Sequence, residues 1–332
     1  MSIEKLFSNF CYATFRITIE AIEPIHFSYF HETVIRGSLG NVLRNMVCLF
    51  KKQECKTCDI RKKCVYAYLF ETIIDNDDPK IKKGLIRSMP EAPHPYIIRI
   101  DPNAKPDYEP GETLSFELVL IGKRAIGYLT YFAGAYLAMG RRGIGAGRGK
   151  FILKSIETIG KDGESKHLFS PENKTIHMGT IICSGDESKN NLSFINQCTI
   201  RFITPLRLLR NRKEVRDIYF AIFFRSLLRR IRDLAAIHCG IENIDWNDIM
   251  QPLNEKINTI ETVKPDKTKL DESYSRFSYR QKQSMTFRGI VGDVTFIGDL
   301  TPFWPFIVLG EKLHIGKNTS FGLGRYRIIE IS

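Results

Sequence analysis

Two glycine-rich loops lie at equivalent places in the two halves of this sequence, and that repetition limits the folds available to the chain. The first loop runs from Gly140 to Lys150, after an apolar stretch with helical spacing and before a stretch that alternates like a strand. The second runs from His314 to Arg325 and has the same two kinds of neighbour. A single glycine cluster is most often an ordinary turn. Two clusters in the same context favour a pseudo-repeat of two similar domains.

Both loops also carry positive charge, and this combination suits a phosphate backbone. Glycine allows backbone N–H groups to approach a ligand closely, while Arg and Lys add charge. The second loop is not a nucleotide P-loop, because no glycine-lysine-serine/threonine step opens a helix after it. The candidate phosphate contacts in the two loops are Arg141, Arg142, Arg148, Gly316, Lys317, Gly322, Gly324 and Arg325.

The composition fits a globular protein of two domains with a polyanionic partner. A chain of 332 residues is long enough for two domains of about 150 residues each, and 43% apolar residues are sufficient for two cores. Lys and Arg number 49 against 37 Asp and Glu, which gives a net charge of +12. Such an excess favours a nucleic acid as partner, although a generic basic surface is the alternative that net charge alone leaves open.

Cysteine usage and the hydrophobic pattern favour a cytoplasmic location. Eight cysteines, four of them within residues 48–64, are too few and too unevenly spaced for a secreted disulfide scaffold. The start of the chain has no apolar segment typical of a signal peptide. The longest uncharged run, 125–140, is shorter than the roughly 20 residues of a membrane-spanning helix. We therefore expect a protein of the reducing cytoplasm without a membrane partner.

The first half of the chain predicts the order β-α-β-β-α-β. Apolar and polar residues alternate as in a half-buried strand near the start, and apolar residues then recur at helical spacing. The expected elements are strands at 13–22, 96–100, 113–121 and 151–159 and helices at 30–49 and 126–139. This order is the ferredoxin-like arrangement, which we assign to a domain at 1–160.

The second half repeats that order with one extra strand in front. The polar, glycine-containing segment 160–174 marks the boundary, so the second domain is expected at 175–332. The expected elements are strands at 176–183, 194–203, 284–288, 291–297 and 326–331 and helices at 214–236 and 300–309. The predicted fold class is therefore α+β, with two tandem ferredoxin-like (RRM-like) domains.

The long helix expected at 214–236 adds candidates for phosphate binding. It has an apolar stripe on one face, while Arg225, Arg229 and Arg232 recur at helical spacing on another. We therefore expect the helix to bury one side and to present arginine on the other.

A cysteine cluster in the first domain predicts a structural metal site in an insertion. Cys48, Cys55, Cys58 and Cys64 are spaced C-x6-C-x2-C-x5-C, and a two-residue gap lets both thiolates of a pair reach one tetrahedral ion. Four thiolates leave no open position for a substrate, so the expected role is structural. Zinc is the first expectation and an iron–sulfur cluster is its main rival, because both accept four cysteines. Unligated buried thiols are the remaining alternative.

Several short segments of the chain carry a family resemblance. They are residues 35–44 in the first half and 204–207, 274–281, 289–292 and 309–324 in the second. Together they resemble the CRISPR-associated endoribonucleases of the RAMP superfamily, which cut precursor crRNA within its repeats. The resemblance implies cleavage without a catalytic metal, in which a substrate 2′-hydroxyl attacks the adjacent phosphate and leaves a cyclic phosphate and a 5′-hydroxyl.

The same resemblance implies partners. It makes CRISPR repeat RNA the ligand of the arginines and glycines named above, and CRISPR effector or adaptation proteins become candidate partners. A non-catalytic RNA-binding subunit of a CRISPR effector complex is the alternative, because the same fold, charge and loops would serve it.

The implied cleavage needs a base, an acid and positive charge on the phosphate, and histidine can serve in either proton-transfer role. Members of the family often keep the working histidine near the first strand-to-helix junction, which here holds His26, Tyr29 and His31. The two histidines are five residues apart and so do not share one helix face. We expect one of them to do chemistry and the other to be structural. The alternatives are His314 with Lys317, and His238.

Overall fold

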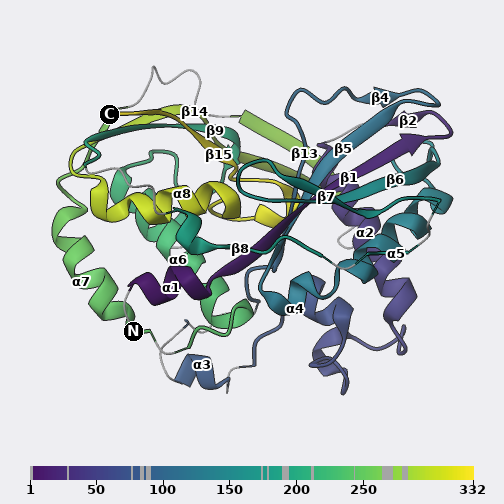
Figure 1. The fold of residues 1–332 in the computed structure, drawn as a ribbon, viewed down its shortest axis with the longest axis horizontal. Helices are drawn as coiled ribbons and strands as arrows, with labels where there is room; N and C mark the ends of the chain where they lie inside the picture. Colours follow the sequence, from purple (N-terminus) through teal and green to yellow (C-terminus); the bar gives the residue numbers. More distant parts are fainter. Residues whose placement is uncertain are drawn as a thin grey trace. The chain divides into compact units, whose positions relative to one another are not determined.

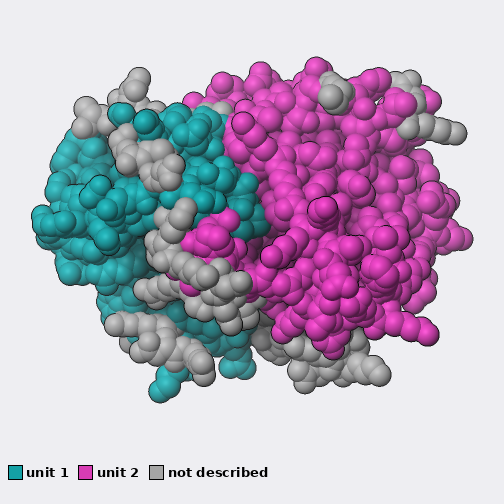
Figure 2. All heavy atoms as spheres, turned by 90° about the horizontal axis from the view of Figure 1, so that it is seen from below, with its two compact units in different colours: residues 1–10, 83–86, 184–332 teal, residues 11–82, 87–183 magenta. Residues whose placement is uncertain are grey.

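The computed structural model contains two compact units, which Figure 2 shows in separate colours. It describes the whole chain except residues 1–2, 28–29, 76–77, 83–85, 87–90, 173–174, 178, 189–193, 211–212, 243, 264–271 and 279–282, and the side chains of 210, 272–278 and 283–287. The N-terminal unit (magenta) comprises residues 11–82 and 87–183, and the C-terminal unit (teal) comprises residues 1–10, 83–86 and 184–332. The boundary lies beyond the polar segment 160–174, because a further strand of the first sheet follows residue 160.

The N-terminal unit contains an antiparallel sheet in the order β3-β5-β1-β6-β7 (Figure 1). Its strands are β1 (Cys11–Ala21), β3 (Tyr96–Arg99), β5 (Thr113–Ile121), β6 (Phe151–Ile159) and β7 (Ser165–Phe169). The first strand in the chain therefore lies between the third and the fourth of the predicted strands, as the ferredoxin-like arrangement requires. The four strands predicted for the first half are confirmed, and β7 is an addition at the sheet edge.

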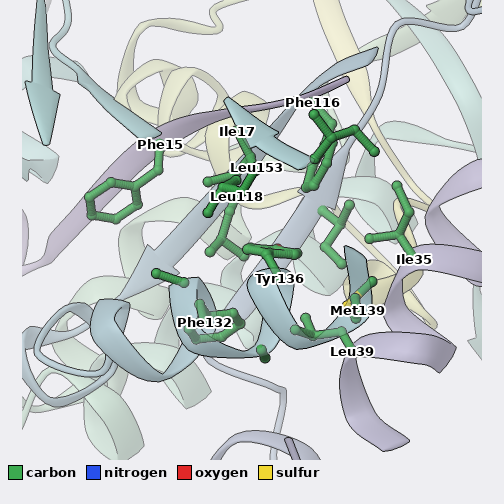
Figure 3. Close-up of a cluster of buried hydrophobic side chains, with 14 of the residues drawn as sticks. Phe15, Ile17, Ile35, Leu39, Phe116, Leu118, Phe132, Tyr136, Met139 and Leu153 are labelled. Carbon is green, nitrogen blue, oxygen red and sulfur yellow. The ribbon is translucent and has the colours of Figure 1, made fainter. Parts of the chain in front are cut away.

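Helices cover one face of this sheet and complete the core (Figures 1 and 3). They are α2 (His31–Val47), α4 (Lys123–Ile126) and α5 (Leu129–Arg142). Side chains two apart on the strands, such as Phe15 and Ile17, point towards side chains four apart on the helices, such as Ile35, Leu39 and Tyr136. Burying each such side chain contributes about 1.5–3 kcal/mol. The apolar residues that predicted the strands and those that predicted the helices thus pack against each other in one core.

Several short elements complete the N-terminal unit, and none of them was predicted. They are β2 (Ile25–His26), β4 (Asp107–Tyr108), the 3-10 turn η1 (Cys55–Thr57), the π-helix η2 (Ala67–Glu71), α3 (Pro79–Lys82) and β8 (Cys183–Ser184). The pair β2–β4 forms a separate two-stranded antiparallel sheet.

The C-terminal unit repeats the arrangement with a sheet in the order β12-β14-β9-β15, to which β13 adds along β14. Its strands are β9 (Gln197–Leu206), β12 (Glu261–Val263), β13 (Glu272–Ser278), β14 (Gln283–Ile297) and β15 (Tyr326–Ile331). Helices α6 (Phe220–His238) and α8 (Trp304–Leu313) pack on it (Figure 1). The phenyl rings of Phe220 and Phe223 lie 5.1 and 5.2 Å from that of Phe296, so α6 packs against the sheet through aromatic contacts.

The remaining elements of this unit are short or peripheral. They are α1 (Ile3–Asn9), η3 (Gly185–Ser188), β10 (Leu209–Arg210), β11 (Lys213–Glu214), α7 (Trp246–Lys256), η5 (Thr301–Phe303) and η6 (Thr319–Phe321). Residues from the start of the chain belong here because the ring of Phe7 packs 5.1 Å from that of Phe306.

Three predictions for the second half differ from the structure. In the expected strand 176–183, the described residues 176–177 and 179–182 are not in a strand, and the Ile181 N–H donates to the Thr158 hydroxyl. The two strands expected at 284–288 and 291–297 are one strand, β14, whose register shifts beside β9 between Ile290 and Gly292. The helix expected at 214–236 begins only at Phe220, because Lys213–Glu214 form β11. Strands β10, β11, β12 and β13 and helices α1 and α7 were not predicted. In the described part of the chain, no helix is both long and apolar enough to cross a bilayer.

Candidate functional site

His26 lies on β2, directly after the turn that ends the first strand of the sheet. Strand β2 pairs with β4, so that His26 faces Asp107, and the Nδ1 atom of its imidazole is hydrogen-bonded to the Asp107 carboxylate. Both side chains remain open to solvent, with exposed fractions of 53% for His26 and 62% for Asp107. The pair is therefore accessible to a ligand.

The Asp107 contact determines which ring nitrogen of His26 is available. An ionised carboxylate only accepts hydrogen bonds, so Nδ1 carries a proton and donates it. The other nitrogen, Nε2, then accepts a proton when the ring is neutral and donates one when the ring is protonated. A histidine held in this way is suited to proton transfer through Nε2.

The first glycine loop packs against the backbone of His26. The Ala146 N–H donates to the His26 carbonyl at 2.8 Å, and a Cβ atom at Gly145 would lie 2.3 Å from that oxygen. A Cβ atom at Gly149 would lie 2.1 Å from the Pro24 carbonyl oxygen. Glycine is therefore required for this close approach. The arginines of the loop that are exposed beside it are Arg141, Arg142 and Arg148.

His31, at the start of α2, has a different environment. Its ring lies 4.2 Å from that of Phe27 and its Nε2 lies 2.9 Å from the Lys105 carbonyl oxygen. Because a carbonyl only accepts, Nε2 carries the proton. Burial lowers the pKa of His31, and the hydrogen bond to Lys105 offsets part of that effect. The half-buried, neutral ring is suited to holding the helix start against β4.

We expect the lowered pKa of His31 to make the fold less stable in mild acid. Unfolded His31 takes up a proton near pH 6.5, whereas the folded side chain resists protonation. The unfolded state then binds more protons, so the free energy of unfolding falls as the pH drops below about 6.5. Urea unfolding of the wild type and of His31→Gln at pH 7.5 and 5.5 should show a smaller loss in the variant. An equal loss would contradict this, and His167→Gln, which replaces a 72% exposed histidine, serves as the control.

Asp107 was not identified as a candidate from the sequence. Asp107 lies between Pro106 and Tyr108 in a stretch that reads as a proline-rich turn. No local spacing indicates that it would pair with a histidine 81 residues earlier. Tyr29 lies outside the described residues.

The second glycine loop is packed onto the end of β9. A Cβ atom at Gly324 would lie 1.8 Å from the Ile315 carbonyl oxygen, and one at Gly316 would lie 2.5 Å from that of Arg207. The Gly322 and Gly324 N–H groups donate to carbonyls of the protein. These glycines thus allow tight backbone packing, and their N–H groups are already used.

The charged and titratable side chains of the second loop differ in exposure. Lys317 is exposed and Arg325 is half-buried. His314 is fully buried with a φ of +56°, and its Nδ1 lies 3.2 Å from the Leu323 carbonyl oxygen. His238, the other alternative, is also buried. Of the four, only Lys317 is fully open to a ligand.

The arginines of α6 also differ from one another. Arg225 and Arg229 are exposed, whereas Arg232 donates to the Asp233 carboxylate at 2.8 Å and has a side chain only 18% exposed. The sequence did not single out Arg230, which is buried and whose Nε donates to the Leu313 carbonyl at 2.8 Å. Burial lowers the pKa of Arg230, and Asp233 offsets part of the effect. Arg230 therefore holds the end of α8, directly before the second glycine loop.

The four clustered cysteines line one small pocket in the N-terminal unit. Its walls include Cys48, Cys55, Cys58 and Cys64 together with apolar side chains of the same loop. Burial raises the pKa of the Cys55 thiol, Glu71 raises it further, and the nearby Cys64 and Cys48 add to the rise. The described residues contain no group of three or more His, Cys, Asp or Glu side chains arranged to hold a metal ion. In kind, four cysteine thiolates are the donor set of a structural zinc or an iron–sulfur cluster.

Two family models match this chain, and together they leave few residues unmatched. Residues 9–181, just over half of the chain, match a family described as an N-terminal domain. Residues 200–326 match the CRISPR-associated endoribonuclease Cas6 family. No protein in a search of curated proteins matches the chain.

Solved structures share the fold at low sequence identity. A Cas6 product complex has a TM-score of 0.52 at 13% identity, over 96% of this chain and 100% of that chain. Cas6 from Thermus thermophilus has a TM-score of 0.51 at 14% identity, over 96% and 99%. The partial Cas6-RT-Cas1–Cas2 complex has a TM-score of 0.52 at 12% identity, over 97% of this chain and 46% of that chain.

Two α+β units of ferredoxin-like strand order, each with a glycine loop before its last core strand, give this chain the fold of the solved Cas6 structures. The family matches make the assignment more specific. Residues 200–326 are similar to the CRISPR-associated endoribonuclease Cas6 family, and this match supports a Cas6-type protein.

Proposed function

We propose that this protein is an endoribonuclease that cuts CRISPR repeat RNA without a catalytic metal ion. The observation that carries the proposal is the arrangement around His26. Its Nδ1 is held by Asp107, its side chain is exposed, and a loop with three exposed arginines packs against its backbone. The match to the Cas6 endoribonuclease family supports repeat RNA as the substrate.

The proposed reaction transfers a phosphate bond within the RNA. The 2′-hydroxyl next to the scissile phosphate loses a proton as its oxygen bonds to phosphorus, and the bond from phosphorus to the 5′-oxygen breaks. The leaving oxygen takes up a proton, which gives a cyclic phosphate and a 5′-hydroxyl. His26 moves one of these two protons through Nε2, as a base when neutral or as an acid when protonated.

Asp107 and the arginines support this step in different ways. Asp107 fixes the ring orientation and the tautomer of His26, as a carboxylate does beside a catalytic histidine. The exposed Arg141, Arg142 and Arg148 stabilise the negative charge that grows on the phosphate. His31 has a structural role, because it is half-buried and bonded to a carbonyl.

We also propose that Cys48, Cys55, Cys58 and Cys64 hold one structural zinc ion, with an iron–sulfur cluster as the rival. The support is their common pocket and their spacing. Bound metal would fix the loop between α2 and η2, and it would take no part in the reaction. CRISPR effector or adaptation proteins are the proposed recipients of the cleaved RNA.

Cleavage in EDTA tests the proposed function against the non-catalytic alternative. Purified protein incubated with its cognate repeat RNA should cut the RNA once per repeat without added metal, because the nucleophile belongs to the substrate. The metal bound to the protein is measured before and after, so that loss of a structural ion is seen separately. A shifted band without cleavage would instead favour an RNA-binding subunit, and the absence of both would remove RNA processing altogether.

A further inference from the structure

A cluster of three tyrosines around one arginine lies on the N-terminal unit, and the proposed cleavage uses none of these residues. Its members come from the cysteine loop, η2, α4 and the start of α5 (Figure 1), and we name them the tyrosine–arginine patch: Lys62, Tyr68, Arg124, Tyr128 and Tyr131.

The guanidinium of Arg124 organises the patch. Its Cζ atom lies 4.1 Å from the ring centre of Tyr68 and 5.8 Å from that of Tyr128. Its Nε donates to the Tyr128 hydroxyl at 3.2 Å, and its Nη2 donates to the Lys62 carbonyl at 3.0 Å. Among its described partners there is no carboxylate, so the positive charge of Arg124 is not compensated by an acid within the patch.

The side chains of the patch that would contact a ligand are exposed to solvent. Arg124 is exposed and Tyr131 is 38% exposed. The Lys62 side chain is 80% exposed, and its ammonium lies 3.4 Å from the Asp75 carboxylate, so Arg124 is the cation of the patch that an acid does not offset. The Tyr131 ring packs edge-on against Tyr128, with centres 5.6 Å apart at 90°. The patch thus offers a stacked cation and a braced aromatic ring at the surface.

We propose that the tyrosine–arginine patch binds unpaired bases of the RNA beyond the cleavage site, which rests on the proposed function. Proteins grip single-stranded nucleic acid by combining aromatic rings, on which bases stack, with cations that contact the backbone and the base faces. The patch has both, and the net charge of +12 favours a polyanion over an acidic or neutral protein surface.

Helix α5 relates the patch to the His26 site within the same unit. The patch lies at its N-terminal end, and the first glycine loop, which contacts His26, follows its C-terminal end. Fourteen residues at about 1.5 Å each give a separation of about 20 Å. At about 3.4 Å per nucleotide, the spacing along one strand of a DNA duplex, that distance corresponds to roughly six nucleotides. The patch should therefore contact bases about six nucleotides from the cut.

The cysteine loop holds the patch in place. The Lys62 carbonyl that accepts from Arg124 lies two residues before Cys64, which lines the cysteine pocket. Order in the cysteine loop is thus transmitted to Arg124 through one hydrogen bond. Under this proposal the cysteine loop not only stabilises the fold but also positions Arg124 for contact with RNA.

The test measures affinity for two RNAs that carry a single 2′-deoxynucleotide at the cut, so that binding is read without cleavage. On the side of the cut that reaches the patch, the short RNA ends two nucleotides beyond the cut and the long RNA ends ten nucleotides beyond it. Tyr131→Ala should weaken binding of the long RNA by about 5- to 150-fold, the range for losing one stacked base, and leave the short RNA unaffected. Tyr131→Phe should bind both as the wild type does, because the ring remains.

Leu137→Ala provides the matched control, since Leu137 lies on the same helix and is 37% exposed. It should bind both RNAs as the wild type does. Unchanged affinity of Tyr131→Ala for the long RNA would overturn the proposal and leave a protein partner as the occupant of the patch. Equal weakening for both RNAs would overturn it as well. Failure of the wild type to bind either RNA would instead refute the proposed function itself.

Discussion

Replacing His26 by alanine is expected to slow single-turnover cleavage of repeat RNA by roughly 100- to 10,000-fold, the usual cost of losing a general acid or base. The reason is that Nε2 of His26 is the exposed nitrogen of a ring whose other nitrogen is held by Asp107. Affinity for the RNA should change little, because the arginines of the first glycine loop remain. The measurement compares the cleavage rate at saturating protein with the dissociation constant for uncleavable RNA.

Two further variants test whether the loss of cleavage is specific to His26. Asp107→Asn should slow cleavage less than His26→Ala does, since the imidazole remains but loses the carboxylate that fixes its orientation. His167→Ala, at a 72% exposed histidine in the same unit, should cut at the wild-type rate. If His26→Ala cuts normally, the assignment is wrong. The pair of His314 and Lys317 would then need a rearranged loop, because His314 is fully buried.

Replacing Cys55 and Cys58 together by serine is expected to abolish metal binding and to destabilise the N-terminal unit. Elemental analysis of the wild type should give close to one zinc per chain, or iron with a visible absorption band if the site holds a cluster. Two lost thiolates leave too few donors for a tetrahedral site. The loss of a structural metal should lower the free energy of unfolding by more than about 4 kcal/mol.

Cys239→Ser is the control for this experiment, because Cys239 has intermediate exposure and lies in the C-terminal unit. Its metal content should equal that of the wild type. Wild-type protein that is free of metal, with an unchanged melting temperature in the double variant, would show that the four thiols line the pocket as ordinary side chains.

The sequence predicted the repeated fold because periodicity reports burial directly. The alternation through Phe15 and Ile17 predicted β1, and it holds because those side chains enter the core. For the four core strands of the second half, β9, β12, β14 and β15, the predicted number was right only because two errors compensated. Gly289 and Gly292 suggested a turn between two strands, whereas Gly289 allows β14 to pass close to the Leu206 carbonyl of β9. The second core strand is instead β12, which at three residues is too short to show a period.

The candidate site was only partly predictable, because its parts meet through long-range contacts. His26 and the first glycine loop were each found as separate features, yet nothing local indicates that Ala146 bonds to the His26 carbonyl. No sequence motif around Asp107 indicates a functional role for it. In the second glycine loop a conspicuous pattern was misleading, because its glycines pack against the backbone at the end of β9, for example Gly316 against Arg207 directly after that strand. A glycine-rich sequence does not distinguish close backbone packing from a ligand site.

The central claim, RNA cleavage by the substrate's own 2′-hydroxyl with His26 moving a proton, is tested most directly by changing one atom of the RNA. Wild-type protein in EDTA is given repeat RNA that is all-ribose or that has a single 2′-deoxynucleotide before the scissile phosphate. We expect the first RNA to be cut into products with a cyclic phosphate and a 5′-hydroxyl, and the second to be bound with equal affinity and left intact. Cleavage of the deoxy substrate, or cleavage only after a divalent metal is added, would contradict the account.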